Sequence, residues 1–270
     1  MELPFLESIL KDLSLPAWQY YEEVGSTNDV ALTWLKSGAP DGAVVIAGHQ
    51  TRGRGRLGRT WITVPEAGLA FTLIVRPDEG APLPPERLTA LGALAVAQAF
   101  EAGFGLNAQI KWPNDVLISG RKVCGILVEL AWTDNYLQGA VLGIGINVGR
   151  AAVPPASHLN YPAISMEEVL GHPVSRWEVL HQVLRAYLAW RPHLVAPEFI
   201  AAWESRLAFR GEWVRAEDGL NPPLIGRVEG LSPAGHLHLR LKDGRDHWLT
   251  AGEIRPIKPL FAESSGGEDA

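Results

Sequence analysis

Residues 53–59 of the chain alternate glycine with arginine, and the residues that follow them are poor helix formers. Gly53, Gly55 and Gly58 have the G-x-G-x-x-G spacing of a dinucleotide-binding turn. In that fold a helix begins at the third glycine, so that its N-terminus meets the pyrophosphate. Here a β-branched and aromatic run follows instead and ends at Pro65. The sequence therefore argues against a Rossmann fold and predicts a loop.

The same loop is strongly basic within an acidic chain. Four arginines stand in positions 52–59, whereas the whole chain has a formal net charge of -6 at pH 7. Guanidinium groups are planar, permanently charged donors that match carboxylate and phosphate oxygens, and glycines let the backbone approach a bound group. The loop is typical of a site for phosphate, carboxylate or both. A solvated basic loop is the plainer alternative.

A second motif, KWPND at residues 111–115, stands between two strand-like runs. The prolyl ring restricts the backbone, and the Asn and Asp side chains can hydrogen-bond to it locally, so the motif predicts a turn. A Ser-Gly pair at 119–120 predicts a hairpin. Lys111 and Lys122 would then lie at defined places on paired strands, although an ordinary hairpin with solvated lysines explains either lysine alone.

The pattern of apolar residues predicts helices mixed with hairpin-connected strands. With 270 residues, 47% of them apolar, the chain can bury one large core and has room for a second, small domain. Helices are expected from about 27 to 37, with Ser26 or Thr27 as the cap, from the prolines at 84–85 to about 103, from 175 to 191, and from 197 to 209. Strands are expected at 43–48, 68–75, 108–112, 123–131 and 136–148. This mixture predicts an α+β fold and not a regular parallel alternation.

Short strands dominate the sequence from about Gly211. They are expected at 213–216, 224–231, 237–241 and 247–249, with a tight turn at 242–245. Apolar and polar residues alternate along 236–241, which indicates one buried face and predicts a small β-barrel-like domain. His236 and His238 have no further ligand at metal-binding spacing, so a metal site is not expected there.

Features of cellular location are few. No apolar run approaches the roughly twenty residues of a membrane span, and the N-terminus lacks the basic start and apolar core of a secretory signal. The single cysteine, Cys124, cannot form an internal disulfide and is expected to be buried. We expect a cytoplasmic protein.

Four segments together make the chain resemble the biotin protein ligases, enzymes that join biotin to a lysine of a carrier protein. They are GSTN at 25–28, GRGRLGRTW at 53–61, KWPND at 111–115 with KVCGILVE at 122–129, and GIGINV at 143–148. The sequence departs from this family at Leu57, where many members carry another arginine. The resemblance implies a class II synthetase-like mixed sheet with flanking helices in a catalytic domain at 1–209 and an SH3-like β-barrel domain at 210–258. The polar tail at 259–270 is expected to be disordered.

The resemblance also implies a reaction in two steps. Biotin's carboxylate attacks the α-phosphate of ATP, with Mg²⁺ on the phosphates, and biotinyl-5'-AMP then acylates a lysine of the biotin carboxyl carrier protein domain of acetyl-CoA carboxylase or a related carboxylase. Cations must offset the repulsion between the two anions of the first step. The catalytic residues expected are Arg56, Lys111 and Asp115. Asp115 would position or deprotonate the attacking amine, or would only cap the turn.

Two sets of ligand contacts follow from the same resemblance. The expected biotin-binding residues are Ser26, Thr27, Asn28, Gln50, Arg54, Gly55, Arg56, Lys122 and Gly125. The expected ATP-binding residues are Arg54, Arg59, Trp61, Lys111, Asn114 and Asn147. Hydroxyls and amides suit a ureido ring, and cationic donors suit a carboxylate. Trp61 is expected to wall the adenine or else to pack in the core, and no metal ligand is assigned. The Gly-Arg loop is expected to be mobile when empty and to close over the adenylate.

Further expectations concern regulation, assembly and rival functions. About two dozen residues precede Ser26, fewer than a winged-helix domain needs, so neither DNA binding nor a transcriptional repressor role is expected. Exposed edges of the catalytic sheet could pair as a homodimer. One alternative is a lipoate–protein ligase or related acyltransferase. The other, in a different class, is a nucleic-acid-binding module, although the interleaved aromatic residues of a single-strand platform are lacking.

Overall fold

The computed structural model describes residues 2–78, 83–134, 136–217 and 222–257. The tail expected to be disordered, 259–270, lies outside these residues. No helix in the described ranges is both long and apolar enough to cross a membrane.

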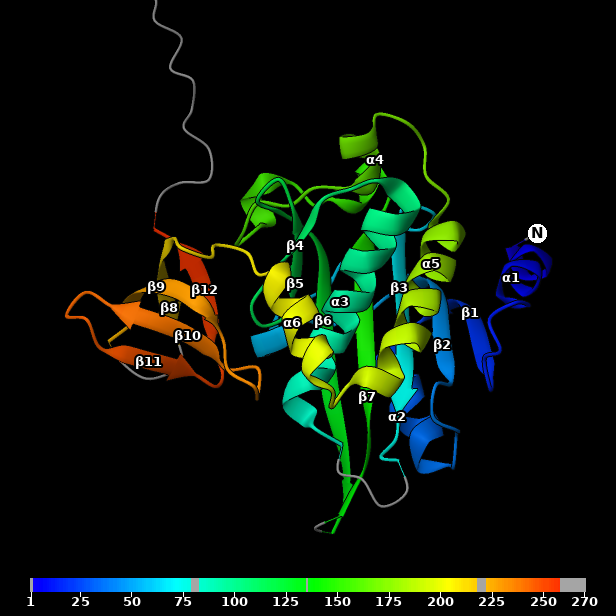
Figure 1. Ribbon diagram of the computed structural model, residues 1–270. Helices are drawn as coiled ribbons and strands as arrows, with labels where there is room; N and C mark the ends of the chain where they lie inside the picture. The colour runs from blue at the N-terminus through cyan, green and yellow to red at the C-terminus, as the bar shows by residue number, and fades with distance from the viewer. Residues whose placement is uncertain (1, 79–82, 135, 218–221, 258–270) are drawn as a thin grey trace, which may run out of the picture.

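A seven-stranded mixed sheet forms the centre of the larger domain, with the strand order β1-β2-β3-β7-β6-β5-β4 (Figure 1). The strands are β1 (Trp18–Val24), β2 (Val44–Gln50), β3 (Gly68–Val75), β4 (Ala108–Lys111), β5 (Asp115–Ile118), β6 (Arg121–Thr133) and β7 (Tyr136–Asn147). Only β1 and β2 pair in parallel, and the other neighbours are antiparallel. The predicted α+β class with a mixed sheet is confirmed.

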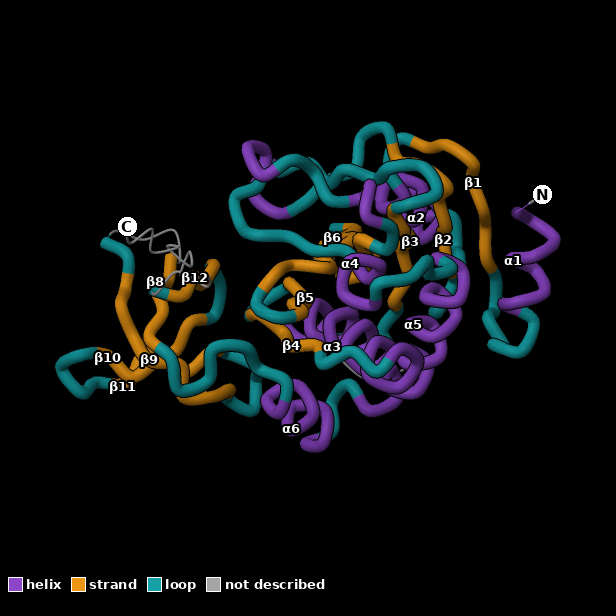
Figure 2. Tube along the Cα trace, turned by 90° about the horizontal axis from the view of Figure 1, so that it is seen from above, coloured by secondary structure: helices purple, strands orange, loops and turns teal. Residues whose placement is uncertain are grey.

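Helices cover the two faces of this sheet unequally. The single helix α2 (Thr27–Lys36) packs on one face, while α3 (Pro85–Phe104) and α5 (Arg176–Trp190) pack on the other (Figure 2). We call these the α2 face and the α3/α5 face. The remaining helices are α1 (Glu2–Leu10), α4 (Met166–Leu170) and α6 (Pro197–Ser205), with single 3-10 turns η1 (Arg56–Gly58), η2 (Arg150–Ala152), η3 (Ala156–His158) and η4 (Arg191–His193).

Alternation along the strands divides the apolar residues between two cores. Phe71 and Leu73 of β3 belong to the large core beneath α3 and α5, whereas Ile74 belongs to a small core that includes Ala31 and Leu35 of α2. Because successive side chains of a strand point to opposite faces, one strand can supply both cores.

A second, five-stranded antiparallel sheet has the order β11-β10-β9-β8-β12 and lies beside the β4 edge of the large sheet (Figure 1). Its strands are β8 (Trp213–Glu217), β9 (Leu224–Leu231), β10 (Leu237–Leu241), β11 (Asp246–Leu249) and β12 (Glu253–Pro256). The indole of Trp112 donates to the carbonyl of Gly235 (3.1 Å), and Arg87 donates to the carbonyl of Pro233 (2.6 Å). These bonds fix the small sheet against the part of the chain that holds the large sheet.

Several local expectations were incomplete. Strands β1 and β12 and helices α1 and α4 were not predicted, and α6 ends at Ser205 instead of 209. Ser26 occupies the N-cap position of α2, as predicted, but its hydroxyl makes no capping hydrogen bond. The side chain of Gln50 serves this end of the helix instead, because its Oε1 accepts from the backbone N–H of Thr27 at 2.8 Å.

Candidate active site

Two adjoining cavities contain every residue that the sequence assigned to a ligand or to catalysis. The first cavity lies over β6 and β7 on the α2 face, and the second continues from it toward the small sheet. All nine predicted biotin contacts line the first cavity. Of the predicted ATP contacts, Lys111 and Asn147 line the second, Arg59 and Trp61 line both, and Arg54 and Asn114 line the first.

Glycines on β6 and β7 leave room for the first cavity. Gly125 of β6 lies directly opposite Gly145 of β7, and Gly143 stands two residues before Gly145 on the same strand. All three glycines therefore lie on the α2 face. A β-carbon added at Gly143 would collide with the amide of Asn28, and one added at Gly145 would collide with the ring of Trp61. The G-I-G-I pattern thus keeps this face open while Ile144 and Ile146 fill the opposite core.

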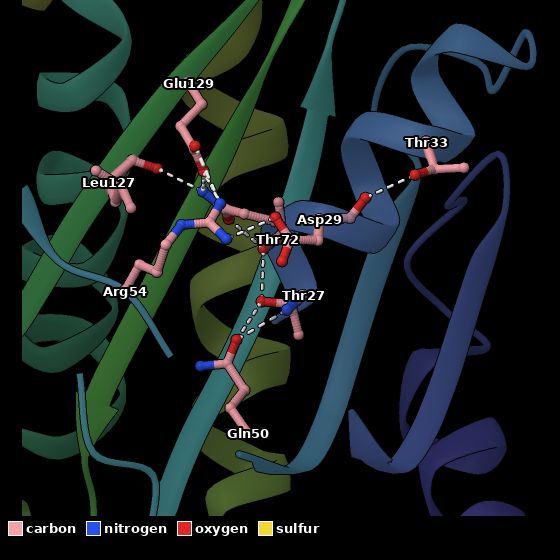
Figure 3. A network of polar contacts seen from close by, with 9 residues as sticks. Thr27, Asp29, Thr33, Gln50, Arg54, Thr72, Leu127 and Glu129 are labelled. Carbon is pink, nitrogen blue, oxygen red and sulfur yellow. Dashed lines mark hydrogen bonds and ion pairs between the residues drawn. The ribbon is translucent and has the colours of Figure 1, made fainter. Parts of the chain in front are cut away.

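A buried polar network lines one end of the first cavity (Figure 3). The backbone N–H and the hydroxyl of Thr27 both bond to Oε1 of Gln50, at 2.8 and 3.0 Å. The hydroxyl of Thr72 lies 2.7 Å from the Thr27 hydroxyl and 2.7 Å from Oδ1 of Asn28. Two hydroxyl protons serve three oxygen–oxygen contacts, so one contact has no hydrogen bond, and the oxygens there keep lone pairs that can accept from an N–H of a ligand. This end suits a neutral polar ring.

An ionic network joins the Gly-Arg loop to the same end (Figure 3). Arg54 pairs with Asp29 of α2 (2.5 Å) and with Glu129 of β6 (2.7 Å). Glu129 also accepts from the amide of Asn28 at 2.7 Å. The first arginine of the motif is thus bound to the wall of the cavity.

A cationic cluster marks the boundary between the cavities. The turn between β4 and β5 places Asp115 between the ammonium groups of Lys111 (2.9 Å) and Lys122 (2.6 Å). Burial disfavours the charged carboxylate, but the two lysines outweigh it and lower the pKa of Asp115 to about 2. The group carries a net positive charge, and it can therefore receive an anion.

The other loop arginines also face inward. Arg56 donates to Oδ1 of Asn114 (2.8 Å) and to the carbonyl of Gly252 in the small domain (3.2 Å), and burial lowers the pKa of its guanidinium. Arg59 pairs with Glu253 of β12 at 2.6 Å. Leu57, in place of the family's arginine, is 74% exposed at the loop tip. These contacts replace the solvated-loop interpretation with a loop that connects two domains.

Aromatic rings separate and cover the cavities. Trp61 packs on Gly145 and Gly125, and the ammonium of Lys122 lies 5.6 Å from its ring centroid. Tyr161, in the second cavity, lies over Lys111 at 4.9 Å and donates to the carbonyl of Gly120 at 3.0 Å. Trp61 therefore lines both cavities and is not plain core packing.

Sequence reasoning missed two polar residues of the network and one aromatic residue. Thr72 interrupts the apolar run of β3, and Glu129 interrupts that of β6, so an isolated polar residue in a buried strand was the available signal. Glu129 was quoted within a motif but received no role. Tyr161 lies in a segment without a predicted element, where no pattern marked it.

The site has neutral donors and acceptors at one end and cations at the other. This arrangement defines an enzyme site that can bring the carboxylate of a polar ring compound to a second anion.

Residues 20–147 match the Biotin/lipoate A/B protein ligase family. The biotin--[acetyl-CoA-carboxylase] ligase of Paracoccus denitrificans is 38% identical over 229 residues, which cover 82% of this chain and 92% of that protein. The bifunctional ligase/repressor BirA of Bacillus spizizenii is 34% identical over 229 residues, covering 83% and 70%. The chain belongs to this family, on its biotin protein ligase branch.

The fold agrees with a solved structure of the same branch. A biotin protein ligase from Aquifex aeolicus, in complex with biotin and ATP, superposes with a TM-score of 0.76 at 29% identity, covering 89% of this chain and 98% of that chain. The superposition extends into the part of the chain that holds the five-stranded sheet, because 89% of the chain is more than residues 1–209.

Proposed function

We propose that the protein attaches biotin to a lysine of a carrier protein in an ATP-dependent reaction through biotinyl-5'-AMP. The observation that carries this proposal is the position of the cationic cluster between two cavities. The first cavity offers amide and hydroxyl groups for the ureido ring of biotin, and the second offers Lys111 and Asn147 for a nucleotide. The carboxylate of biotin and the α-phosphate of ATP would meet where Lys122 and Asp115 line both spaces.

In the first step, an oxygen of the biotin carboxylate attacks the α-phosphorus, and the bond to the bridging oxygen of the β-phosphate breaks to release pyrophosphate. Lys111 and Arg56 offset the charge that the two anions bring together. Both side chains are already positioned, Lys111 by Asp115 and Arg56 by Asn114. Prepositioned charges need no reorganisation during the reaction, which is the source of their effect.

In the second step, the neutral amine of the carrier lysine attacks the acyl carbon, the bond to the AMP oxygen breaks, and the amine loses a proton. With a pKa of about 2, Asp115 is a weak proton acceptor in the free enzyme. We assign it the positioning of Lys111 and Lys122, and not the removal of the proton. A variant that lacks this carboxylate should therefore fail in the first step as well as in the second.

The nucleotide would lie in the second cavity, with Trp61 as the wall toward biotin and Arg59 and Arg255 at the side of the small domain. Mg²⁺ would enter with the phosphates of ATP. Within the described ranges no group of three His, Cys, Asp or Glu side chains could hold a metal ion. The carboxylates that line the second cavity, Asp115 and Glu253, are paired with cations.

The test is biotin-dependent exchange of labelled pyrophosphate into ATP by the purified protein in the presence of Mg²⁺. Lipoate and octanoate serve as controls, because the matching family includes lipoate ligases as well as biotin ligases. Exchange with biotin alone is expected. Exchange with lipoate alone would move the protein to the lipoate branch, and no exchange with any acid would refute the ligase proposal.

The carrier would be the biotin carboxyl carrier protein domain of acetyl-CoA carboxylase or of a related carboxylase. Transfer of biotin to such a domain, detected by a mass increase at a single lysine, tests this part. Cytoplasmic location, a homodimer and the absence of a repressor role stay predictions.

A further inference from the structure

We propose that Glu129 is a positioning residue that joins the Gly-Arg loop to the wall of the first cavity. One carboxylate binds both the loop and the cavity wall, so closure of the loop and order in the cavity would depend on each other. The proposal rests on the proposed function. Neither the reaction chemistry nor the ligand contacts considered above require this carboxylate.

The geometry around Glu129 is shared between two partners (Figure 3). Its Oε2 accepts from the Asn28 amide at 2.7 Å and from Nη2 of Arg54 at 2.7 Å, and its Oε1 lies 3.0 Å from the same Arg54 nitrogen. Glu129 pairs with Val141 across β6 and β7, which places it on the α2 face in line with Leu127 and Gly125. The side chain is 30% exposed, so water only partly screens these charged bonds.

On the cavity side, Glu129 fixes the orientation of Asn28. The amide of Asn28 is buried, and its oxygen accepts from Thr72 while its nitrogen donates to Glu129. A carboxylate can only accept, so it selects the nitrogen of the amide and directs the oxygen toward Thr72. The Thr72 hydroxyl in turn contacts Thr27. The carbonyl of Leu127 accepts from the same Asn28 nitrogen at the longer distance of 3.4 Å, so Glu129 is the stronger of two acceptors that set how the hydroxyl and amide groups of the cavity are presented.

On the loop side, Glu129 holds the start of the loop. Arg54 forms an isolated β-bridge with Thr60, and the N–H of Gly55 donates to the carbonyl of Arg59 at 2.7 Å. The two limbs of the loop are thus bonded to each other, and fixing Arg54 fixes both. Asp29 also holds Arg54, but its side chain is 51% exposed. Glu129 differs from Asp29 in reaching the cavity as well.

The test compares Glu129→Gln with Asp29→Asn in pyrophosphate exchange and in the escape of preformed biotinyl-adenylate. The glutamine side chain keeps the shape of the glutamate but loses its charge and one acceptor. We expect Glu129→Gln to raise both the KM for biotin and the rate of adenylate escape about tenfold, as for a lost hydrogen bond to a charged group. Asp29→Asn should raise the escape rate by a smaller factor and leave the KM for biotin unchanged, because it holds only the loop.

Glu168→Gln is the matched control, since Glu168 forms a comparable ion pair with Arg121 (2.6 Å) outside both cavities. A double variant, Glu129→Gln with Arg54→Gln, should show escape no faster than the faster single variant. A folded Glu129→Gln protein with wild-type KM and escape rate would overturn the proposal. If that variant does not fold, an unchanged escape rate in Arg54→Gln, which removes the loop partner of Glu129, overturns the loop half. Failure of the proposed function would instead appear as no exchange by the wild-type protein.

Discussion

The two faces of the central sheet are made from the same strands but have opposite character. The α3/α5 face carries large apolar side chains, such as Phe71, Leu73 and Ile144, that pack into the main core. The α2 face carries glycines and polar residues between smaller apolar contacts, with Gly143 and Thr72 directly paired across β3 and β7. One face supplies the stability of the domain, and the other supplies the site.

The comparison shows how a rigid site can be built without a separate loop scaffold. Residues one position apart on β3 serve different purposes, because a strand turns alternate side chains to opposite faces. Packing on the α3/α5 face fixes the position of the strand backbone. The backbone in turn fixes the positions of the polar side chains on the α2 face. Substitutions on one face should therefore change stability, and substitutions on the other should change activity.

The largest expected effect is on stability, from Leu73→Ala on the α3/α5 face. Leu73 is fully buried, so the variant loses apolar burial and leaves a cavity, which costs about 2–5 kcal/mol of unfolding free energy. Urea denaturation measures this loss, and the KM for biotin of the folded protein should not change. The neighbour Thr72→Val is the matched variant, and it should raise the KM with a smaller loss of stability. If both variants changed the stability and the KM for biotin in the same way, the result would contradict a division of stability and activity between the two faces.

Gly143→Ala tests the α2 face directly. The added methyl group would displace Asn28, and a displacement of about 1 Å in a site can reduce the rate about a hundredfold. Biotin-dependent pyrophosphate exchange, corrected for the folded fraction, measures the loss. The control is Gly92→Ala on α3, where the same methyl group meets Leu142 and Ile126 of the opposite core. Exchange close to wild type in Gly143→Ala would show that the space above this glycine is not used.

The third prediction concerns acid stability at the cationic cluster. The pKa of Asp115 lies below its ordinary value of 3.8, at about 2, because Lys122 and Lys111 outweigh the effect of burial. A lowered pKa contributes stability above the unfolded pKa, and this contribution is lost as the pH falls toward the folded pKa. The advantage of wild type over Asp115→Asn, on the order of 2 kcal/mol, should therefore shrink between about pH 4 and pH 2. Urea unfolding at a series of pH values measures it, and parallel curves for the two proteins would argue against the pairing.

The smallest expected effect comes from Glu253→Gln, where the site of the α2 face meets the small domain. The Arg59 side chain is 40% exposed, so the pair is worth less than about 1 kcal/mol. We expect the KM for ATP to rise about two- to fivefold at low salt, and the difference to shrink at high salt because ions screen exposed pairs. Asp243→Asn removes an ion pair with Arg245 at a turn of the same sheet and is the control. An equal effect of both variants would mean that contact with the loop is irrelevant.

The sequence by itself determined the motifs shared with the family, their place between strands and most of the secondary structure. The Gly-Arg loop, the KWPND turn and the G-I-G-I strand are local patterns, and their geometry follows from backbone preferences over a few residues. The ligand residues were predicted in the same way, by position within such motifs. The missed strands β1 and β12 lie at sheet edges, where partial exposure weakens the pattern.

Only the tertiary structure decided which groups meet. Arg54 and Glu129 are 75 residues apart in the chain, and Arg56 and Gly252 are 196 apart, so no local spacing could pair them. Thr72 and Glu129 look like polar interruptions in apolar strands until the register of β3, β7 and β6 places both on the α2 face. Their roles depend on long-range packing, because the effect of a buried polar group depends on the hydrogen-bond partner that the fold places beside it.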